Sequence, residues 1–470
     1  MPDQFWYADA GTLRRLFGSG AASPVEYVRS TLDRVEELNP ELGAFITVDR
    51  EGALAAAREA EQRIRSQGDA AFRDAPLLGM AVSIKDLIPT RGLRTTRGSL
   101  LFQDWVPDFD APAVERLRRA GAVIIGKTNT SEFGWSGAAR NRLVPPTRNP
   151  WARELTSGGS SGGAAASVAM GVGVGAVGTD GAGSLRIPAA FCGVVGFKPS
   201  FGRVPYVPVS VEGMSHQGPI ARSVDDLALL LDVMAGPDAR DPLSLPGPNW
   251  DLGGVPAGPL RIAWIRSLAG PPHPDPAIEK RAAETVAALG VAGHTVTDLD
   301  PGLPDPYLIA ETILTTLTAA ATADAAADRL DPGLLALVEV GKRTSGVELS
   351  RAALRRAEYT ERIRVLMNEY DLLAMPTVPV PPFPADRDFP DLAVGKGALE
   401  WLTWTPSTFP FNLTGQPAIS VPAGFTPAGL PVGLQLVAGW RADDTVIRAA
   451  RQLESLRPWR DSYAALGAEP

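Results

Sequence analysis

Two glycine-rich segments near the middle of the chain carry serines in a pattern that suits nucleophilic chemistry. Residues 156–163 read TSGGSSGG, and residues 178–188 read GTDGAGSLRIP. Glycines adopt backbone conformations closed to other residues and let a ligand approach the main chain closely. A flexible linker can have a similar composition, but apolar stretches flank both segments. We therefore interpret them as loops inside a folded domain, where a site can form.

A serine nucleophile in these loops needs a base, because a hydroxyl ionises only far above neutral pH. The chain has only three histidines, so lysine is the natural substitute. Lys85 ends the apolar stretch VSIK, where a strand would deliver its amine into a site. A lysine base must be neutral. Moving its pKa from about 10.4 to near 7 costs roughly 4–5 kcal/mol, which burial can supply.

Three further motif matches are weaker. GAVIIGKT at 121–128 fits the phosphate-loop pattern, but a helix is expected before it and AVII is typical of a buried strand. GVGAVG at 173–178 fits the dinucleotide fingerprint, but no helix starts after it. GGSSG at 158–162 fits the nucleophile elbow of hydrolases. That interpretation stays open with His216 as the base, although a histidine that holds a loop or packs in a core is the more common role.

The two serine segments closely resemble the amidase signature family. The resemblance rests on GGSSGG at 158–163 and on GTDGAGSLRIPAAFCGVVGFKP at 178–199. Shorter matches follow in the family's order: SIKD at 83–86, GKTN at 126–129, SEF at 131–133, RNPW at 148–151, GPIAR at 218–222, FNLTGQPAISVP at 411–422 and GLPVGLQ at 429–435. The likeness covers most of the chain from about 25 to 455, and residues 240–400 carry little of it.

The resemblance implies that carboxylic amides are hydrolysed through an acyl-serine, with a triad of two serines and a lysine. By position, Ser184 takes the place of the nucleophile, Ser160 that of the bridging serine after a cis peptide bond, and Lys85 that of the base. The products would be a carboxylate and ammonia or an amine. The remaining roles fall on the loop around the nucleophile: an oxyanion hole from the backbone of Gly181, Ala182, Gly183 and Ser184, and support from Asp180 and Arg186.

The chain departs from the family pattern at two positions. Ala182 stands where the family commonly has glycine, and its Cβ is expected to narrow the oxyanion loop. Ser157 stands where proline is frequent, which we interpret as a matter of stability. We expect Ser161 to begin a helix and Cys192 to be a packing residue, because neither shows a base nearby in the sequence.

The substrate is not specified by the sequence. An aromatic cluster formed by Trp401, Trp404, Phe409 and Phe411 would suit an apolar acyl pocket or the core equally well. Our hypothesis is a general amidase for small aryl or alkyl carboxamides. One alternative is the A subunit of a glutamyl-tRNA amidotransferase, which resembles the same family and works in a complex. Another is a non-catalytic scaffold, which the presence of Lys85, Ser160 and Ser184 disfavours.

Composition limits the partners. The 45 basic and 53 acidic residues give a net charge of −8 and a pI near 5.2 without a basic stripe, so no nucleic-acid partner is expected. No stretch is long and apolar enough for a membrane span, and no metal-ligand spacing occurs, so we predict neither metal nor cofactor. The single cysteine and the start of the chain, which does not resemble a secretory signal, favour the cytoplasm. The expected partner is a small-molecule amide, and a homodimer is compatible with the sequence.

The elements that must position these residues alternate between helix and strand, which predicts an α/β fold. Residues 1–70 are expected to be helical, with a capping box at Ser23–Glu26 and a stop at Asn39-Pro40. Strands are expected at 80–84, 122–125, 371–375, 418–425 and 432–437, helices at 51–66, 110–120, 223–234 and 443–455, and a β-α-β unit at 260–299. We expect one domain over 1–470, with a signature core at about 75–235 and a variable, mostly helical region at about 300–370. The resemblance implies a mixed, twisted sheet covered by helices on both faces.

Overall fold

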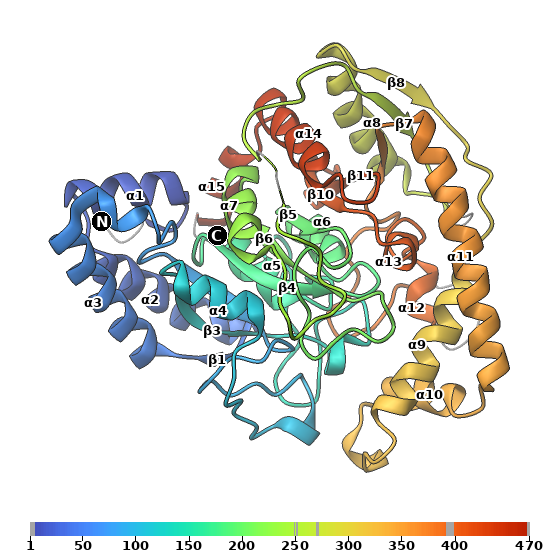
Figure 1. The fold of residues 1–470 in the computed structure, drawn as a ribbon, viewed down its shortest axis with the longest axis horizontal. Helices are drawn as coiled ribbons and strands as arrows, with labels where there is room; N and C mark the ends of the chain where they lie inside the picture. The colour runs from blue at the N-terminus through green and yellow to red at the C-terminus, as the bar shows by residue number, and fades with distance from the viewer. Residues whose placement is uncertain (1–4, 249, 251, 269–271, 392–398, 468–470) are drawn as a thin grey trace.

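One mixed sheet runs through the whole molecule in the computed structural model (Figure 1). The structure describes residues 5–248, 250, 252–268, 272–391 and 399–467. The first four residues, which belong to the N-terminal segment discussed above as unlike a secretory signal, lie outside the described residues. Within these residues the sheet has eleven strands in the order β1-β3-β2-β4-β6-β5-β10-β11-β9-β7-β8. The strands are β1 Phe45–Val48, β2 Ala81–Lys85, β3 Val123–Thr128, β4 Gly175–Asp180, β5 Val195–Lys198, β6 His216–Ala221, β7 Arg261–Trp264, β8 Thr295–Asp298, β9 Leu372–Pro376, β10 Ala418–Phe425 and β11 Pro431–Ala438.

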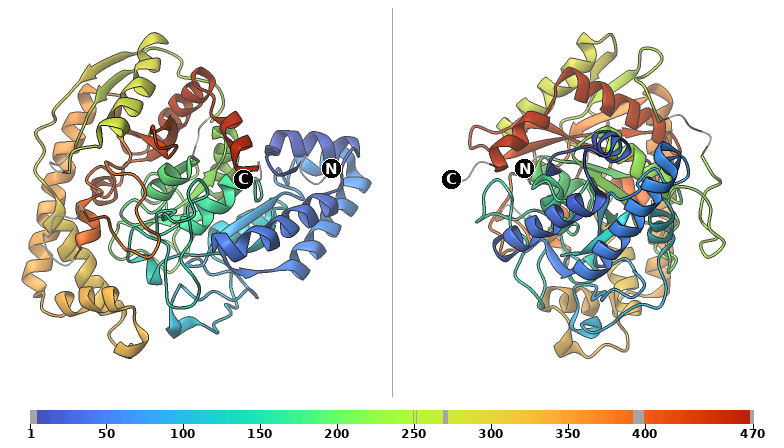
Figure 2. Two further views of the ribbon diagram at one scale, coloured as in Figure 1. Left: turned by 180° about the vertical axis from the view of Figure 1, so that it is seen from behind. Right: turned by 90° about the vertical axis from the view of Figure 1, so that its left-hand side faces the viewer.

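Helices cover both faces of this sheet, as predicted. They are α1 Ala10–Ser19, α2 Pro24–Leu42, α3 Arg50–Gln67, α4 Pro112–Arg119, α5 Gly162–Ala169, α6 Arg186–Cys192, α7 Val224–Met234, α8 Pro276–Val291, α9 Tyr307–Ala321, α10 Pro332–Gly341, α11 Gly346–Glu369, α12 Glu400–Thr403, α13 Pro410–Thr414, α14 Asp443–Leu456 and α15 Ala464–Gly467. The helices α1, α2 and α3 lie at one end of the molecule, and α9, α10 and α11 lie at the other (Figures 1 and 2).

Two glycines of β4 show how the helices are divided between the faces. Gly178 faces Ser161 and Leu185, at the starts of α5 and α6, whereas Gly175 faces Leu230 of α7. Positions three apart on a strand point to opposite faces, so α5 and α6 cover one face and α7 covers the other. The helix α14 packs on α7 and α8 packs on α14, and both α8 and α14 lie against the hairpin of β10 and β11.

The strand pairing brings several strand ends to one edge. β2 pairs in parallel with β3 on one side and with β4 on the other. The carboxyl ends of parallel strands lie at the same edge of a sheet. Lys85 at the end of β2 therefore lies beside Thr179 and Asp180 at the end of β4, which places the predicted base next to the second serine segment.

Most residues of both weak nucleotide-binding matches, the phosphate-loop match at 121–128 and the dinucleotide match at 173–178, lie in strands, as expected for segments that do not form nucleotide-binding loops. Residues 123–128 of the first are buried in β3, and residues 175–178 of the second belong to β4. The predicted β-α-β unit is also confirmed, with β7 and β8 parallel and α8 between them. The region at 300–370 is mostly helical, as expected. None of the described helices is long and apolar enough to cross a membrane.

Two local predictions are wrong. The helix that starts at the capping box of Ser23 and Glu26 does not stop at Asn39-Pro40 but runs to Leu42. Its last turn is closed instead by Gly43, which has a φ of 63° and donates its N–H to the Asn39 carbonyl. The segment 1–70 is also not helical throughout, since Phe45–Val48 form the strand β1, which pairs antiparallel with β3.

The sheet can hold α6 closely because small residues meet at the contact. A Cβ on Gly196 of β5 would lie 2.6 Å from the Ala189 Cβ and 2.6 Å from the Leu185 carbonyl oxygen. Such distances are too short for any carbon contact. The glycine therefore sets the depth of α6, and α6 begins with the Arg186 side chain that the site requires.

The substitution Gly196→Ala is expected to push α6 away from the sheet. We expect the free energy of unfolding to fall by about 1–3 kcal/mol, the usual cost of overpacking a core, with some loss of activity. Chemical denaturation measures the first effect. Gly258→Ala is the matched control, since a Cβ there meets no atom within 4 Å. Equal stability of the two variants would contradict this account of the contact.

Candidate active site

Three side chains predicted to react lie in one hydrogen-bonded row. The Lys85 Nζ is 2.7 Å from the Ser160 Oγ, and the Ser160 Oγ is 3.1 Å from the Ser184 Oγ. They come from the end of β2, the loop before α5 and the loop between β4 and α6. All three residues are buried. The structure thus brings together residues that lie 75 and 24 positions apart in the chain.

A fourth hydroxyl completes the surroundings of the lysine. The Lys85 Nζ donates to the Thr179 Oγ1 at 2.8 Å. Sequence reasoning assigned no role to Thr179, although it stands directly before Asp180 in the second serine segment. The signal that would have found it is the parallel pairing of β2 with β4, which aligns their ends.

Burial decides the protonation state of Lys85. Removal from water disfavours the charged ammonium and lowers its pKa well below the usual lysine value, while the Asp180 carboxylate acts in the opposite direction and is outweighed. The neighbours that face its Nζ are neutral hydroxyls. The amine is therefore suited to be neutral and to accept a proton.

The Asp180–Arg186 pair fixes the loop that carries Ser184. The Asp180 carboxylate accepts the N–H groups of Gly183 and Leu185 at 2.7 and 3.1 Å, and it pairs with the Arg186 guanidinium at 2.9 Å. Burial alone would raise the pKa of Asp180, but Arg186 outweighs it and holds that pKa well below its usual range. The carboxylate stays ionised and binds both ends of the short loop.

Arg186 extends this support to a distant part of the chain. Its guanidinium donates to the Thr408 carbonyl, to the Gln435 Oε1 and to the Asn412 Oδ1 at 2.8, 2.8 and 2.6 Å. The Asn412 amide in turn donates to the Asp180 carboxylate at 2.9 Å. Sequence reasoning gave these three residues no role, although all but Thr408 lie in segments that resemble the family.

The backbone of the loop offers fewer free donors than predicted. The N–H of Gly183 is already bound to Asp180, which argues against its predicted place in the oxyanion hole. Among the described residues, no acceptor takes the N–H groups of Gly181, Ala182 or Ser184. These three residues also line the cavity described below. Three donors thus remain beside the Ser184 hydroxyl.

The first serine segment is shaped by close packing. The peptide bond between Gly159 and Ser160 is cis, as the resemblance implied. A Cβ on Gly159 would lie 2.5 Å from the Ala138 carbonyl carbon, so only glycine fits there. Ser161 stands at the start of α5, as expected, and its Oγ donates to the Thr179 carbonyl at 3.1 Å instead of capping the helix. Cys192 is buried, and burial raises the pKa of its thiol far above the usual value.

His216 is a buried structural residue. It lies on β6, and its Nδ1 is 2.6 Å from the Met214 carbonyl oxygen and 3.2 Å from the Asp180 carbonyl oxygen. Its Nε2 is 3.3 Å from the Lys198 Nζ. Burial, with the field of Lys198, lowers its pKa well below the usual histidine value. Both ring nitrogens are therefore occupied away from the serine row.

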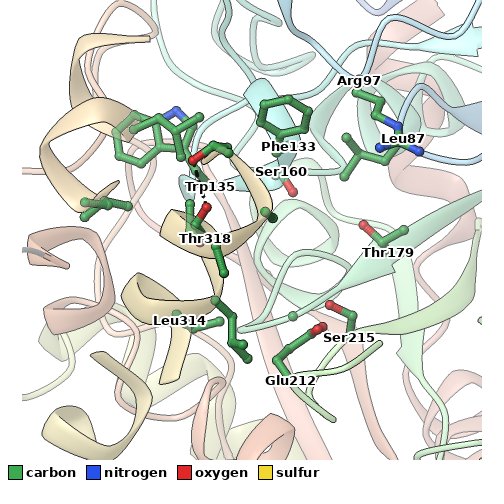
Figure 3. Close-up of a pocket in the computed structure, with 18 of the residues that line it drawn as sticks. Leu87, Arg97, Phe133, Trp135, Ser160, Thr179, Glu212, Ser215, Leu314 and Thr318 are labelled. Carbon is green, nitrogen blue, oxygen red and sulfur yellow. Dashed lines mark hydrogen bonds between the residues drawn. The ribbon is translucent and has the colours of Figure 1, made fainter. Parts of the chain in front are cut away.

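A cavity of about 570 Å³ opens over the serine row and offers room for a small-molecule substrate. Figure 3 shows Ser160 and Thr179 on one side of it and Leu314 and Thr318 of α9 on the other. Most of the wall is apolar: Leu87, Leu101, Phe102, Phe133 and Trp135 come from the loops around the site, and Leu314, Leu317, Leu334 and Leu337 from α9 and α10.

The aromatic cluster near residue 400 is divided between cavity and core. Trp401 lines the cavity, but Trp404 does not. Trp404 is fully buried and stacks on Phe191 with ring centroids 6.0 Å apart. Phe409 and Phe411 are also core residues. Of the two interpretations of this cluster, core packing holds for Trp404 and the two phenylalanines, and of the four aromatic residues Trp401 alone lines the cavity.

No described group of three or more His, Cys, Asp and Glu side chains is placed to hold a metal ion. The chemistry of the site is that of hydroxyls, an amine and backbone amides.

Comparison with known proteins agrees with this geometry. The model of the Amidase family matches residues 26–447. The chain is 37% identical over 460 residues to an acylamidase of Rhodococcus erythropolis, with 95% of each chain covered. It is also 37% identical over 495 residues to the A subunit of the glutamyl-tRNA(Gln) amidotransferase of Thermus thermophilus, covering 97% of this chain and 99% of the other.

A solved structure extends the likeness to three dimensions. The crystal structure of a bacterial aryl acylamidase of the amidase signature family superposes with a TM-score of 0.90 at 28% identity and covers 99% of both chains. The match of a family model over most of the chain and the identity to full-length relatives lead to one conclusion. This chain belongs to the amidase signature family and is an amide-hydrolysing enzyme.

Proposed function

We propose that the protein hydrolyses small carboxylic amides through an acyl-enzyme on Ser184, with Ser160 as a proton relay and Lys85 as the general base. One observation carries the proposal: the unbroken row from the Lys85 Nζ through the Ser160 Oγ to the Ser184 Oγ on the floor of the cavity. Among the described hydroxyls of the cavity wall, those of Ser160 and Thr179 contact the Lys85 amine directly, and that of Ser184 reaches it through Ser160.

The first half of the reaction follows from the row. The neutral Lys85 amine accepts the proton of Ser160, and Ser160 accepts the proton of Ser184. The freed Ser184 oxygen attacks the amide carbonyl carbon and forms a tetrahedral oxyanion. Thr179 accepts an N–H of Lys85 and so directs the lone pair of the amine toward Ser160.

The oxyanion is stabilised by the loop of the nucleophile. The free N–H groups of Gly181, Ala182 and Ser184 belong to residues that line the cavity, and each donor of an oxyanion hole contributes roughly 3–4 kcal/mol to stabilising the transition state. Asp180 and Arg186 act as positioning residues that hold this loop in place before substrate arrives. Ala182 lines the cavity, and its side chain is expected to limit the bulk of a substrate near the carbonyl carbon.

The second half returns the protons. The Lys85 ammonium gives its proton through Ser160 to the leaving nitrogen, and ammonia or an amine departs. Water then attacks the ester on Ser184 with the same base, which releases the carboxylate and regenerates the enzyme.

The cavity supports an aryl or alkyl carboxamide as substrate. Its wall is mainly apolar, and one of the compared proteins is named an acylamidase and another an aryl acylamidase. The competing proposal is a component of an amidotransferase complex, which the likeness to the Thermus thermophilus protein supports. The two differ in whether the purified chain acts alone.

Purified protein is expected to release ammonia or amine from simple amides without any other protein, and Ser184→Ala is expected to lose at least about 1000-fold in kcat. Ser350→Ala, on the exposed face of α11, is the matched control. The readout is product release together with the mass of the acylated protein. Activity that appears only with added partner proteins would favour the amidotransferase component, and activity that survives in Ser184→Ala would refute the triad.

The pH profile is expected to report Lys85. Because its pKa lies well below the lysine value of about 10.4, kcat/KM should rise with pH along a limb centred well below that value and then level off. Between the two pKa values the unfolded chain holds a proton that the folded protein lacks, so the free energy of unfolding also rises with pH there.

Lys85→Met should remove both effects. Denaturation at several pH values gives the free energy of unfolding of the wild type and of Lys85→Met. The wild-type value minus the variant value should increase from neutral pH toward the pKa of an unfolded lysine. The control is Lys280→Met on the exposed surface of α8, for which no such trend is expected. A difference that does not change with pH would show that Lys85 is charged in the folded protein.

His216→Asn distinguishes the triad from a histidine-dependent hydrolase. The asparagine amide can donate to the Met214 carbonyl as the imidazole does, so the fold around β6 should persist. We expect kcat to stay within about tenfold of wild type, because a general base contributes far more than that. A loss as large as that of Ser184→Ala in a folded variant would restore His216 as the base.

A further inference from the structure

Arg97 is a cation inside the reaction cavity for which the protein supplies no anion. It lines the same cavity as Ser160 and Ser184 and is half-buried. Its Nε is enclosed without a hydrogen-bond partner, and among the described residues its guanidinium makes neither a hydrogen bond nor an ion pair. Buried donors are nearly always satisfied in native proteins, so an exception calls for an explanation.

The guanidinium is held by two aromatic rings instead. It lies 4.8 Å from the centroid of the Phe102 ring and 5.0 Å from that of Trp105. The two rings meet edge to face with centroids 5.7 Å apart. Such contacts fix the direction of an arginine and leave its in-plane N–H groups free to bind a ligand.

The backbone of Arg97 is fixed as well. Its N–H donates to the Asp86 carbonyl, and its carbonyl accepts the N–H of Phe133. Its φ is 55°, in the left-handed region where a side chain other than glycine is uncommon. Asp86 directly follows Lys85, and its carboxylate accepts the N–H of Thr96 at 2.9 Å. The strand end that delivers the base thus also sets the position of this cation.

The charges nearby leave Arg97 uncompensated. Arg97 is close enough to Lys127, a second cation, to contribute to lowering the pKa of that lysine, and the polar group that acts on Arg97 itself is the Tyr206 hydroxyl. Burial lowers the pKa of Arg97, since no carboxylate offsets the loss of water.

Two carboxylates do line the cavity, but each is accounted for elsewhere. The Glu212 carboxylate accepts the Ser210 hydroxyl at 2.7 Å and lies in the field of Arg356. Asp324 is exposed at the end of α9. In Figure 3, Arg97 lies near the top of the view and Glu212 near the bottom, and Thr179 lies at a height between them. The end of the cavity that is lined by Arg97 is therefore available to an anionic ligand.

We propose that the preferred substrates carry a carboxylate in addition to the scissile amide, and that Arg97 binds this carboxylate. Arginine suits the role because its planar fork matches both oxygens of a carboxylate. The inference rests on the proposed amide hydrolysis at Ser184 and narrows its substrate class to anionic amides.

The test compares matched substrates. Glutaric acid monoanilide carries a carboxylate on the acyl side, and para-acetamidobenzoate carries one on the amine side. In each neutral counterpart a methyl ketone replaces the carboxylate. We expect wild type to favour the carboxylate in at least one pair by about 30-fold in kcat/KM, the usual worth of a charge-assisted hydrogen bond. The readout is release of the aromatic amine: aniline from the glutaryl pair, and aminobenzoate or aminoacetophenone from the other pair.

Arg97→Gln should bring that ratio close to one, and Arg97→Lys should restore part of it, because it keeps the charge and loses the fork. Arg91→Gln, an exposed arginine of the same loop, is the matched control and should leave the ratio as in wild type. The proposal is overturned if wild type shows no preference in either pair, or if Arg97→Gln keeps the preference.

A binding measurement separates this proposal from the proposed function. Titration calorimetry with glutaric acid monoanilide is done on Ser184→Ala and on the double variant that adds Arg97→Gln. Weaker binding to the double variant, by about tenfold or more, supports the carboxylate site even if no amide is hydrolysed. Equal binding to both folded proteins overturns it, whatever the activity of the wild type.

Discussion

The buried ion pair between Asp180 and Arg186 is the interaction on which the active site depends. Both side chains are fully enclosed, and a charge in such a place is tolerated only when paired and hydrogen-bonded. Each oxygen of the carboxylate and each nitrogen of the guanidinium has a hydrogen-bond partner. Two of the partners of the carboxylate are backbone N–H groups of the loop that carries Ser184. The pair therefore turns a glycine-rich loop, which would be flexible on its own, into a rigid part of the core.

The pair also ties the two halves of the chain together. Arg186 begins the helix that packs on β5, and its partners Asn412 and Gln435 lie in α13 and β11, 226 and 249 positions further along. Their contribution is long-range, so loss of one residue would disturb both the hairpin of β10 and β11 and the loop of Ser184. Lys85, in contrast, is held by neutral hydroxyls, and burial depresses its pKa without a competing ion pair at its Nζ. The site thus contains one ionised pair that holds the loop of Ser184 and one amine whose burial favours the neutral form.

The sequence predicted the elements well where the signal was local, and it singled out three residues that the structure brings into one hydrogen-bonded row. Hydrophobic patterns placed β2, β3, α7 and the hairpin, and the serine segments pointed to Lys85, Ser160 and Ser184. What failed depended on contacts across the fold. The N–H of Gly183 is taken by a carboxylate three residues before it, and the role of Thr179 needs the register of β2 against β4. Trp401 lies on a helix of only four residues and Trp404 directly follows it, so the segment is too short to show a periodicity that would separate the two.

The wall opposite the serines comes from a different part of the chain than the floor. The helices α9 and α10, which face Ser160 and Thr179 across the cavity, lie in the stretch that carries little likeness to the family, and they pack on each other and, through α9, on α11. None of the hydrogen bonds that hold Asp180, Arg186 or Lys85 reaches these helices. Substitutions can therefore accumulate in α9 and α10 without cost to the catalytic machinery. Related enzymes with this fold can therefore change their substrate selectivity while the residues around Ser184 stay the same. Exchanging the helices α9 and α10 between relatives is a direct way to engineer a new selectivity.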